Sequence, residues 1–212
     1  MKKIAILGAG RVATAIAKRL EKSGKQFTVG VRDIGKAASN WQGPSGSFVA
    51  SEEAVSDNDV IFNATPGETS VAYLKPFSDH LAGKVVVDVS NALLRDGNGN
   101  PRGLLYPGSS VGEKLQEAVP DALIVKTLNT MLFSVIADPD ILSVKPMAFL
   151  SGNSIDAKHL VRALLLEFGW TDGLIEDLGG IISARGPEGF MNFVPPIIAN
   201  HGLAPFALTI AR

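Results

Sequence analysis

The fold is decided by the opening stretch KKIAILGAGRVATAIA, residues 2–17. The apolar run 4–7 predicts a short strand, and the spacing of apolar residues after Gly10 predicts a helix. From Gly8 to Ala13 the chain reads Gly-x-Gly-x-x-Ala, which is the dinucleotide-binding fingerprint when it joins a strand to a helix. Gly8 permits the tight turn, Gly10 lets a pyrophosphate approach the backbone, and Ala13 lets the helix pack close to the strand.

A phosphate-binding site follows from this arrangement. The helix expected over 11–23 begins at the glycine loop, so its first turn presents unpaired N–H groups and the positive end of the helix dipole. We therefore expect Gly8, Gly10, Arg11 and Val12 to hold the pyrophosphate of a dinucleotide. A glycine-rich turn without a ligand is the alternative, and the second strand argues against it.

The second strand indicates which dinucleotide binds. Residues 27–31 read Phe-Thr-Val-Gly-Val, and Arg32 ends this strand. An NAD site usually has an acidic residue there, whereas an arginine suits a 2′-phosphate, which it can grip bidentately. Lys36 lies one turn further on and adds positive charge. Asp33 is the competing ribose ligand, but period-two alternation points it away from the side that Arg32 faces, so the pattern favours NADP(H).

The composition excludes several classes of function. The chain has 212 residues, 46% of them hydrophobic, which suits one large domain over residues 1–212. The formal net charge is −1, and no long charged run points to nucleic acid or to a membrane surface. Cysteine is absent, which excludes thiolate metal sites and a cysteine nucleophile and is consistent with the cytoplasm. Gly8 and Gly10 interrupt the N-terminal apolar stretch where a signal peptide is continuous, and no run is long enough to span a bilayer.

Short β-rich runs alternate with helical patterns along the chain. The expected strands are 3–8, 27–31, 47–50, 59–64, 85–89, 122–128, 147–151 and 173–178. The main expected helices are 11–23, 68–80, 110–118 and 155–168. This alternation predicts an α/β fold, a doubly wound parallel sheet of the Rossmann type with a C-terminal α/β extension and a helical tail. Continuous apolar runs such as Val85-Val86-Val87 are typical of strands buried on both faces.

Two segments depart from this alternation. Residues 91–110 are rich in glycine, asparagine and proline and follow a strand, so they lie at the carboxyl edge of the sheet, where ligands bind. We expect a substrate lid there, with a plain surface loop as the alternative. The segment 181–212 is rich in apolar residues, and Pro195-Pro196 is expected to interrupt its helix. We expect this segment to complete an acceptor pocket or a homodimer interface.

Further motifs carry a family resemblance. They are Asn63-Ala64-Thr65-Pro66, Val125-Lys126-Thr127-Leu128-Asn129-Thr130, Met147-Ala148-Phe149-Leu150-Ser151-Gly152, Gly173-Leu174-Ile175-Glu176-Asp177-Leu178-Gly179 and Ser183-Ala184-Arg185, besides the opening Gly8-Ala9-Gly10 and Val29-Gly30-Val31-Arg32. With them the chain resembles, over nearly its whole length, the NADPH-dependent reductases of the deazaflavin coenzyme F420. It is also similar to the cytosolic reductase domain of the six-transmembrane metalloreductases.

The resemblance implies an NADP-dependent oxidoreductase that acts on a small-molecule redox acceptor. Arg32 and Lys36 would hold the 2′-phosphate, and Ala64, Thr65 and Pro66 would line the ribose and nicotinamide side. Asn129 and Thr130 would position the bound rings. The acceptor would be FMN, FAD or a deazaflavin. An asparagine at position 129 is closer to the metalloreductase domain, which handles flavin.

The sequence offers few proton donors, which favours hydride transfer between two rings. A nicotinamide passes hydride to a flavin-like ring with little acid–base help, whereas reduction of a carbonyl needs a positioned donor. His80, His159 and His201 are expected at the surface or in packing roles. Lys126 remains either a candidate acid or a phosphate or backbone partner. A reductase of a small carbonyl or imine, and an NADP(H)-binding redox sensor without turnover, stay open as alternatives.

Polar residues at strand ends leave a second question open. Asn63 and Asn129 either bond the nicotinamide amide or a flavin edge, or they serve the turn at a strand end. Asp88 and Asn91 flank the expected strand 85–89 and are expected to cap the loop that follows it.

Overall fold

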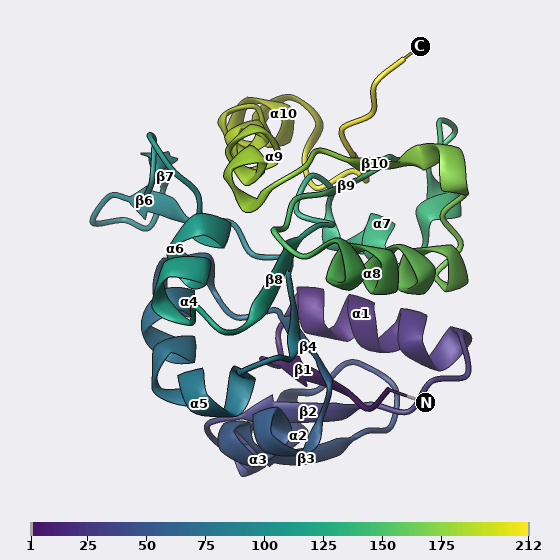
Figure 1. Ribbon diagram of the computed structural model, residues 1–212. Coiled ribbons are helices and arrows are strands. Elements are labelled where there is room, and N and C mark those ends of the chain that lie inside the picture. The colour runs from purple at the N-terminus through teal and green to yellow at the C-terminus, as the bar shows by residue number, and fades with distance from the viewer. Residues whose placement is uncertain (1, 212) are drawn as a thin grey trace.

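A six-stranded parallel sheet forms the centre of the computed structural model, which describes residues 2–211 (Figure 1). Its strand order is β3-β2-β1-β4-β5-β8. The strands are β1 (Ile4–Leu7), β2 (Thr28–Val31), β3 (Ser47–Ala50), β4 (Val60–Asn63), β5 (Val85–Asp88) and β8 (Leu123–Lys126). The predicted doubly wound α/β fold is confirmed.

Helices cover both faces of this sheet and enclose two hydrophobic cores (Figure 1). On one face lie α1 (Arg11–Lys22), α7 (Phe133–Ala137) and α8 (Ile155–Glu167). On the other face lie α3 (Ser51–Asp57), α4 (Gly67–Leu74), α5 (Ser78–Leu81) and α6 (Val111–Ala118).

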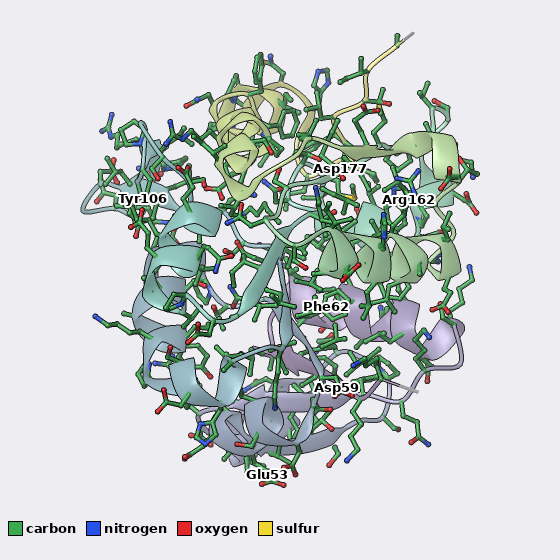
Figure 2. The ribbon with its side chains drawn as sticks, viewed as in Figure 1. Glu53, Asp59, Phe62, Tyr106, Arg162 and Asp177 are labelled. Atoms are coloured by element: carbon green, nitrogen blue, oxygen red, sulfur yellow. The ribbon has the colours of Figure 1, made fainter. Side chains whose placement is uncertain are left out.

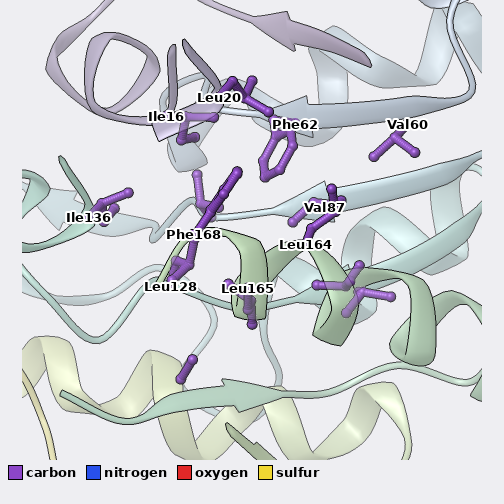
Figure 3. Close-up of a cluster of buried hydrophobic side chains, with 14 of the residues drawn as sticks. Ile16, Leu20, Val60, Phe62, Val87, Leu128, Ile136, Leu164, Leu165 and Phe168 are labelled. Carbon is purple, nitrogen blue, oxygen red and sulfur yellow. The ribbon is translucent and has the colours of Figure 1, made fainter. Parts of the chain in front are cut away.

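Successive residues of a strand serve the two cores in turn. In β4, Val60 and Phe62 join the core under α1 and α8, whereas Ile61 joins the opposite core. The Phe62 ring stacks on Phe168 with 6.2 Å between ring centroids (Figure 3). Phe62 therefore lies inside the fold, while Glu53 of α3 lies at its outer surface (Figure 2). Both faces of β1, β4 and β5 are buried, which explains their continuous apolar runs.

The direction of winding reverses between β1 and β4. The chain runs outward from β1 to β2 and β3, and it returns to β4, which pairs with β1 from Ile4↔Val60 to Leu7↔Asn63. In open α/β sheets, ligands bind outside the carboxyl ends of the strands at such a reversal. The fold thus places the candidate site at the ends of β1, β2 and β4.

The C-terminal α/β extension is a separate two-stranded parallel sheet. It consists of β9 (Ala148–Leu150) and β10 (Ile175–Asp177). An antiparallel bridge between Lys126 and Ser151 attaches it to the end of β8. The two strands expected at 147–151 and 173–178 are therefore present, beside the central sheet instead of within it.

Two connections differ from the sequence-based expectation. The helix expected over 68–80 divides into α4, a 3-10 turn over Lys75–Phe77 and α5. Pro76 explains the division, because it lacks the N–H that a continuous helix needs there. The segment 91–110 forms an antiparallel hairpin of β6 (Leu93–Arg95) and β7 (Pro101–Leu104), which projects from the molecule (Figure 1). It is thus an ordered hairpin, and its role as a lid stays a prediction.

The C-terminal segment is helical, as expected from the sequence, but its helices begin and end at other positions. It contains a 3-10 turn over Ile181–Ala184, α9 (Arg185–Gly189), a 3-10 turn over Phe190–Asn192 and α10 (Val194–His201). The helical run is interrupted before the prolines, and Pro195-Pro196 lie in the first turn of α10. The expected interruption is therefore present, but it lies just before the prolines, which begin the next helix because first-turn N–H groups have no partner within a helix and proline is tolerated there.

Candidate functional site

A cavity of about 730 Å³ lies at the carboxyl ends of β1 and β2. Among the predicted cofactor residues it is lined by Gly8, Arg32, Lys36, Thr65 and Pro66. These residues come from three different connections of the sheet, and the reversal of winding brings them together. The cavity therefore lies where the fold places ligands in this class of sheet.

The glycine loop has the shape that a phosphate requires. Gly8 has φ +103°, and a Cβ there would lie 2.9 Å from the Ala64 carbonyl oxygen. A Cβ on Gly10 would meet no protein atom within 4 Å, so that position faces open space. Gly10 is also the N-cap of α1 and supplies no side-chain acceptor, which leaves the first N–H groups of the helix available for an anion.

Arg11 of the glycine loop contacts the segment that follows β8. Its guanidinium carbon lies 4.9 Å from the centroid of the Phe133 ring, at the start of α7. The contact is a cation–π interaction, and α1 and α7 pack against each other in the same core. Val12 is partly buried against that core. The segment that contains Asn129 and Thr130 is thus held next to the start of α1.

Two cations stand at the end of β2 without an anionic partner. Both Arg32 and Lys36 are exposed and line the cavity, and neither side chain forms an ion pair with any residue among 2–211. Asp33 also lines the cavity, but its Oδ1 accepts a hydrogen bond of 2.9 Å from the Lys36 backbone N–H and caps α2 (Ile34–Asn40). The geometry fits a 2′-phosphate, which two unpaired cations attract.

The turn after β4 is fixed by a buried polar network. Asn63 Nδ2 donates to Ser70 Oγ at 2.6 Å and to Asp88 Oδ1 at 2.9 Å. Its Oδ1 accepts from the Thr65 hydroxyl at 2.7 Å. Both Nδ2 and Oδ1 of Asn63 thus have hydrogen-bond partners within the protein. This favours the interpretation that Asn63 serves the turn at the end of the strand. Thr65 and Pro66 are thereby held against the cavity, with Ala64 beside Gly8.

A buried ion triad occupies the ends of β5 and β8. Lys126 Nζ lies 2.7 Å from Asp88 Oδ2 and 2.9 Å from Glu188 Oε1, and it also donates to the Ser90 carbonyl. Burial lowers the pKa of Lys126, but the two carboxylates outweigh it and raise the pKa above its ordinary value. Lys126 is thus held protonated. Of the alternatives left open, the contacts favour the backbone partner, because Lys126 donates to the Ser90 carbonyl, and a group with a raised pKa and fixed partners is a poor proton donor.

Asp88 holds the loop after β5, as expected. Its Oδ1 accepts from the Ser90 hydroxyl at 2.7 Å and from the Ser90 backbone N–H at 3.2 Å. Asn91 then bridges to the next loop, donating from Nδ2 to the Asn129 carbonyl at 2.8 Å. In return, Asn129 Nδ2 donates to Asn91 Oδ1 at 3.0 Å. The two asparagines tie the ends of β5 and β8 together at the carboxyl edge.

The predicted ring-positioning residues are largely covered. Asn129 and Thr130 are both buried, and Leu128 before them has φ 58°, a conformation that non-glycine residues rarely adopt. The Thr130 carbonyl accepts a hydrogen bond from Leu208 N–H in the C-terminal tail. Contact of Asn129 or Thr130 with a bound ring stays a prediction.

The histidines lie away from this cavity. His80, His159 and His201 are all exposed, and none of them lines it. A larger cavity of about 1090 Å³ is lined by residues near the amino ends of β1, β2 and β3. It lies at the wrong edge of the sheet for a dinucleotide, and lysine and carboxylate side chains are mixed in its lining.

Sequence reasoning missed part of the cavity wall. The residues in question are Ala37, Asn40, Thr69, Ala72 and Tyr73. Ala72 and Tyr73 follow Thr69 by three and four residues, which places all three on one face of α4. That spacing is visible in the sequence directly after the Ala-Thr-Pro turn, and it is the signal that would have found them.

The fold and the cavity define a dinucleotide-binding class of α/β protein, with two unpaired cations at the end of its second strand. Residues 3–92 match the family model of NADP oxidoreductases that are coenzyme F420-dependent. A crystal structure of an Arthrobacter sp. FB24 protein, proposed to be an F420-dependent NADP-reductase, is 34% identical, with a TM-score of 0.91 and 100% of both chains covered. The chain belongs to this family and is an NADP-dependent oxidoreductase.

The chain is also similar to two further proteins of known name. The chain is 28% identical over 172 residues to the F420-dependent NADP reductase of Methanocaldococcus jannaschii, covering 75% of this chain and 76% of that protein. It is 33% identical over 188 residues to the metalloreductase STEAP3 of Rattus norvegicus, covering 88% of this chain. It spans only 36% of the metalloreductase. Within residues 2–211, none of the helices combines the length and the apolar character that crossing a membrane requires.

Proposed function

We propose that this protein transfers a hydride between NADP(H) and a flavin or deazaflavin. One observation carries the choice of acceptor: the only buried cation at the ends of β5 and β8 in the described chain, Lys126, is locked between Asp88 and Glu188. Reduction of a carbonyl or imine needs a proton donor beside the substrate. Transfer between two rings needs chiefly that they be held in contact and kept from water.

The residues of the chain have distinct parts in this proposal. NADPH, when bound, supplies the hydride from its nicotinamide ring. Gly8, Gly10, Arg11 and Val12 bind the pyrophosphate at the start of α1, and Arg32 with Lys36 binds the 2′-phosphate. Ala64, Thr65 and Pro66 border the ribose on the way to the nicotinamide. Asn129 and Thr130 position the two rings.

The C-terminal segment, residues 181–211 of the described chain, is proposed to cover the acceptor. Its tail pairs with the loop that contains Thr130, because Leu132 N–H donates to the Phe206 carbonyl and Met131 bridges Ala207. No residue of α10 is buried, although Val194, Pro195, Pro196, Ile197 and Ile198 are all apolar. The tail thus holds the segment at the proposed ring site, and the apolar helix is proposed to supply the wall that a planar acceptor needs, either alone or together with a second copy in a homodimer.

An acceptor screen tests the proposal. Purified protein is mixed with NADPH and with FMN, FAD, coenzyme F420, a cyclic imine or a small aldehyde, and the loss of NADPH absorbance is followed. Steady oxidation with a flavin or the deazaflavin supports the proposal. Turnover with only the imine or aldehyde overturns the choice of acceptor. Tight NADPH binding without turnover on any acceptor overturns the enzyme proposal in favour of a redox sensor.

A further inference from the structure

Tyr73 faces the predicted 2′-phosphate site from the opposite wall of the cavity. It lies on α4 and lines the cavity together with Arg32 and Lys36. The guanidinium carbon of Arg32 lies 5.9 Å from the centroid of the Tyr73 ring. This distance is within the range, up to about 6 Å, in which a cation is attracted by the face of an aromatic ring.

The Tyr73 ring is itself held in place from two further elements. Its hydroxyl shares a hydrogen bond with Ser51 Oγ, at the start of α3, and Ser51 is buried. The Phe77 ring packs against it edge to face, with ring centroids 6.0 Å apart and planes at 83°. The aromatic face is therefore a fixed surface, because α3, α4 and the 3-10 turn after α4 all contact it.

Arg32 has no other anchor. In the described part of the chain its side chain forms no hydrogen bond or ion pair, and it is exposed to solvent. A free arginine samples many rotamers, and binding a phosphate orders it at an entropic cost. The contact with Tyr73 already favours the rotamers of Arg32 that face the cavity, which lowers this entropic cost. Phosphate binding therefore becomes more favourable.

We infer that Tyr73 is a positioning residue that holds Arg32 at the cavity and thereby strengthens the preference for a dinucleotide with a 2′-phosphate. The inference rests on the proposed role of Arg32 in binding that phosphate. Tyr73 acts through Arg32, and a dinucleotide with a free 2′-hydroxyl gains little from it. The quantity that reports this role is the ratio of the dissociation constants for NAD⁺ and NADP⁺.

Calorimetric titration of variants tests the inference. Tyr73→Leu removes the aromatic face, and the ratio is expected to fall about two- to fivefold, the range for an exposed cation–π contact. Tyr73→Phe keeps the face and is expected to keep most of the ratio. Tyr106→Leu is the matched control, because it makes the same change in the other tyrosine of the chain, which is also partly buried in the same core but does not line the cavity. It is expected to leave the ratio unchanged.

A double-mutant cycle separates the possible failures. In an Arg32→Ala background, Tyr73→Leu should no longer change the ratio, because the residue through which it acts is gone. An undiminished effect in that background would overturn the inference. So would equal losses for both dinucleotides in Tyr73→Leu, accompanied by a lower melting temperature, since Tyr73 would then only stabilise the fold. If Arg32→Ala itself leaves the ratio unchanged, the proposed phosphate site fails.

Discussion

Glu188 of α9 contacts two distant parts of the fold at once. Its Oε1 lies 2.9 Å from Lys126 Nζ at the end of β8, and its Oε2 accepts a hydrogen bond of 2.7 Å from Val111 N–H. Oε1 also accepts from Gly112 N–H at 3.1 Å. One carboxylate thus neutralises a buried ammonium and caps the start of α6. The C-terminal segment is therefore anchored in the core, although its last helix is not buried.

Replacing Lys126 by methionine should destabilise the protein strongly. The variant leaves Asp88 and Glu188 buried without their cation, and breaking a buried ion pair in this way costs about 3–5 kcal/mol. Urea unfolding followed by circular dichroism measures the loss. Lys114→Met is the control, because its pair with Glu117 is a solvent-exposed i,i+3 pair and should contribute at most about 1 kcal/mol. Similar losses in the two variants would contradict the role of the triad.

The pH dependence of the Lys126→Met difference gives an independent check. The folded-state pKa of Lys126 is raised above its ordinary value of 10.5, so its contribution is fully present below pH 10.5 and is lost as the pH rises through the folded-state pKa. The difference in unfolding free energy between wild type and variant should therefore be flat from about pH 7 to about pH 9. A difference that shrinks within that window would mean that Lys126 titrates there, as a proton donor would.

The 2′-phosphate assignment predicts selective loss of NADPH binding. Arg32→Ala removes one of the two unpaired cations at the end of β2. A charge-assisted contact contributes about 1.5–3 kcal/mol, so NADPH binding should weaken roughly 10- to 150-fold. NADH binding should change little, because the free 2′-hydroxyl has no need of the cation. Fluorescence titration measures the affinity of the variant for each cofactor. Equal losses of affinity for NADPH and NADH would contradict the assignment of Arg32 to the 2′-phosphate.

The glycine loop allows the phosphate site to be tested without disturbing the fold. Gly10→Val places its side chain in open space, since an added Cβ meets no protein atom within 4 Å. The melting temperature should stay near that of wild type, while the affinity for both NADPH and NADH collapses. Gly8→Val is the contrasting variant, because φ +103° and the Ala64 carbonyl oxygen at 2.9 Å make it strained. Normal cofactor affinity in folded Gly10→Val would place the pyrophosphate elsewhere.

Local sequence patterns predicted the fold. The side-chain contacts between distant segments could not be predicted from them. The strands and the position of Arg32 followed from apolar runs and from the glycine loop, because these signals lie within a few residues of one another. The ion-pair partners of Lys126 could not be predicted from such local patterns, because Glu188 contacts Lys126 only when α9 packs at the edge of the sheet. The contact between Tyr73 and Arg32 was missed for the same reason, because it spans the winding reversal, although the helical spacing of Tyr73 is visible in the sequence. The sequence identified proline positions but not whether Pro195 begins or ends a helix.

Phe193 offers the sharpest test of the C-terminal segment. Truncation after Gly180 is unsuitable, because it removes Glu188 and leaves the buried Lys126 with one partner fewer. Phe193 is 64% exposed and stacks on Phe190 with 6.1 Å between ring centroids, so its loss should hardly change the melting temperature. If it contacts the acceptor, Phe193→Ala should raise the acceptor's Michaelis constant about three- to tenfold, the effect of leaving about 30–50 Å² of apolar surface unburied. The Michaelis constant for NADPH should stay constant.

The control and the oligomeric state complete this test. Ile155→Ala removes a side chain that is also largely exposed, at 66%, from α8 outside the C-terminal segment, and it should change neither Michaelis constant. Light scattering on both variants reports whether Phe193 lies in a homodimer interface, in which case Phe193→Ala weakens association. Equal changes in both Michaelis constants together with a lower melting temperature would assign Phe193 to stability alone. Acceptor kinetics, association and melting temperature that all match wild type would exclude this face of the segment from both the acceptor site and the interface.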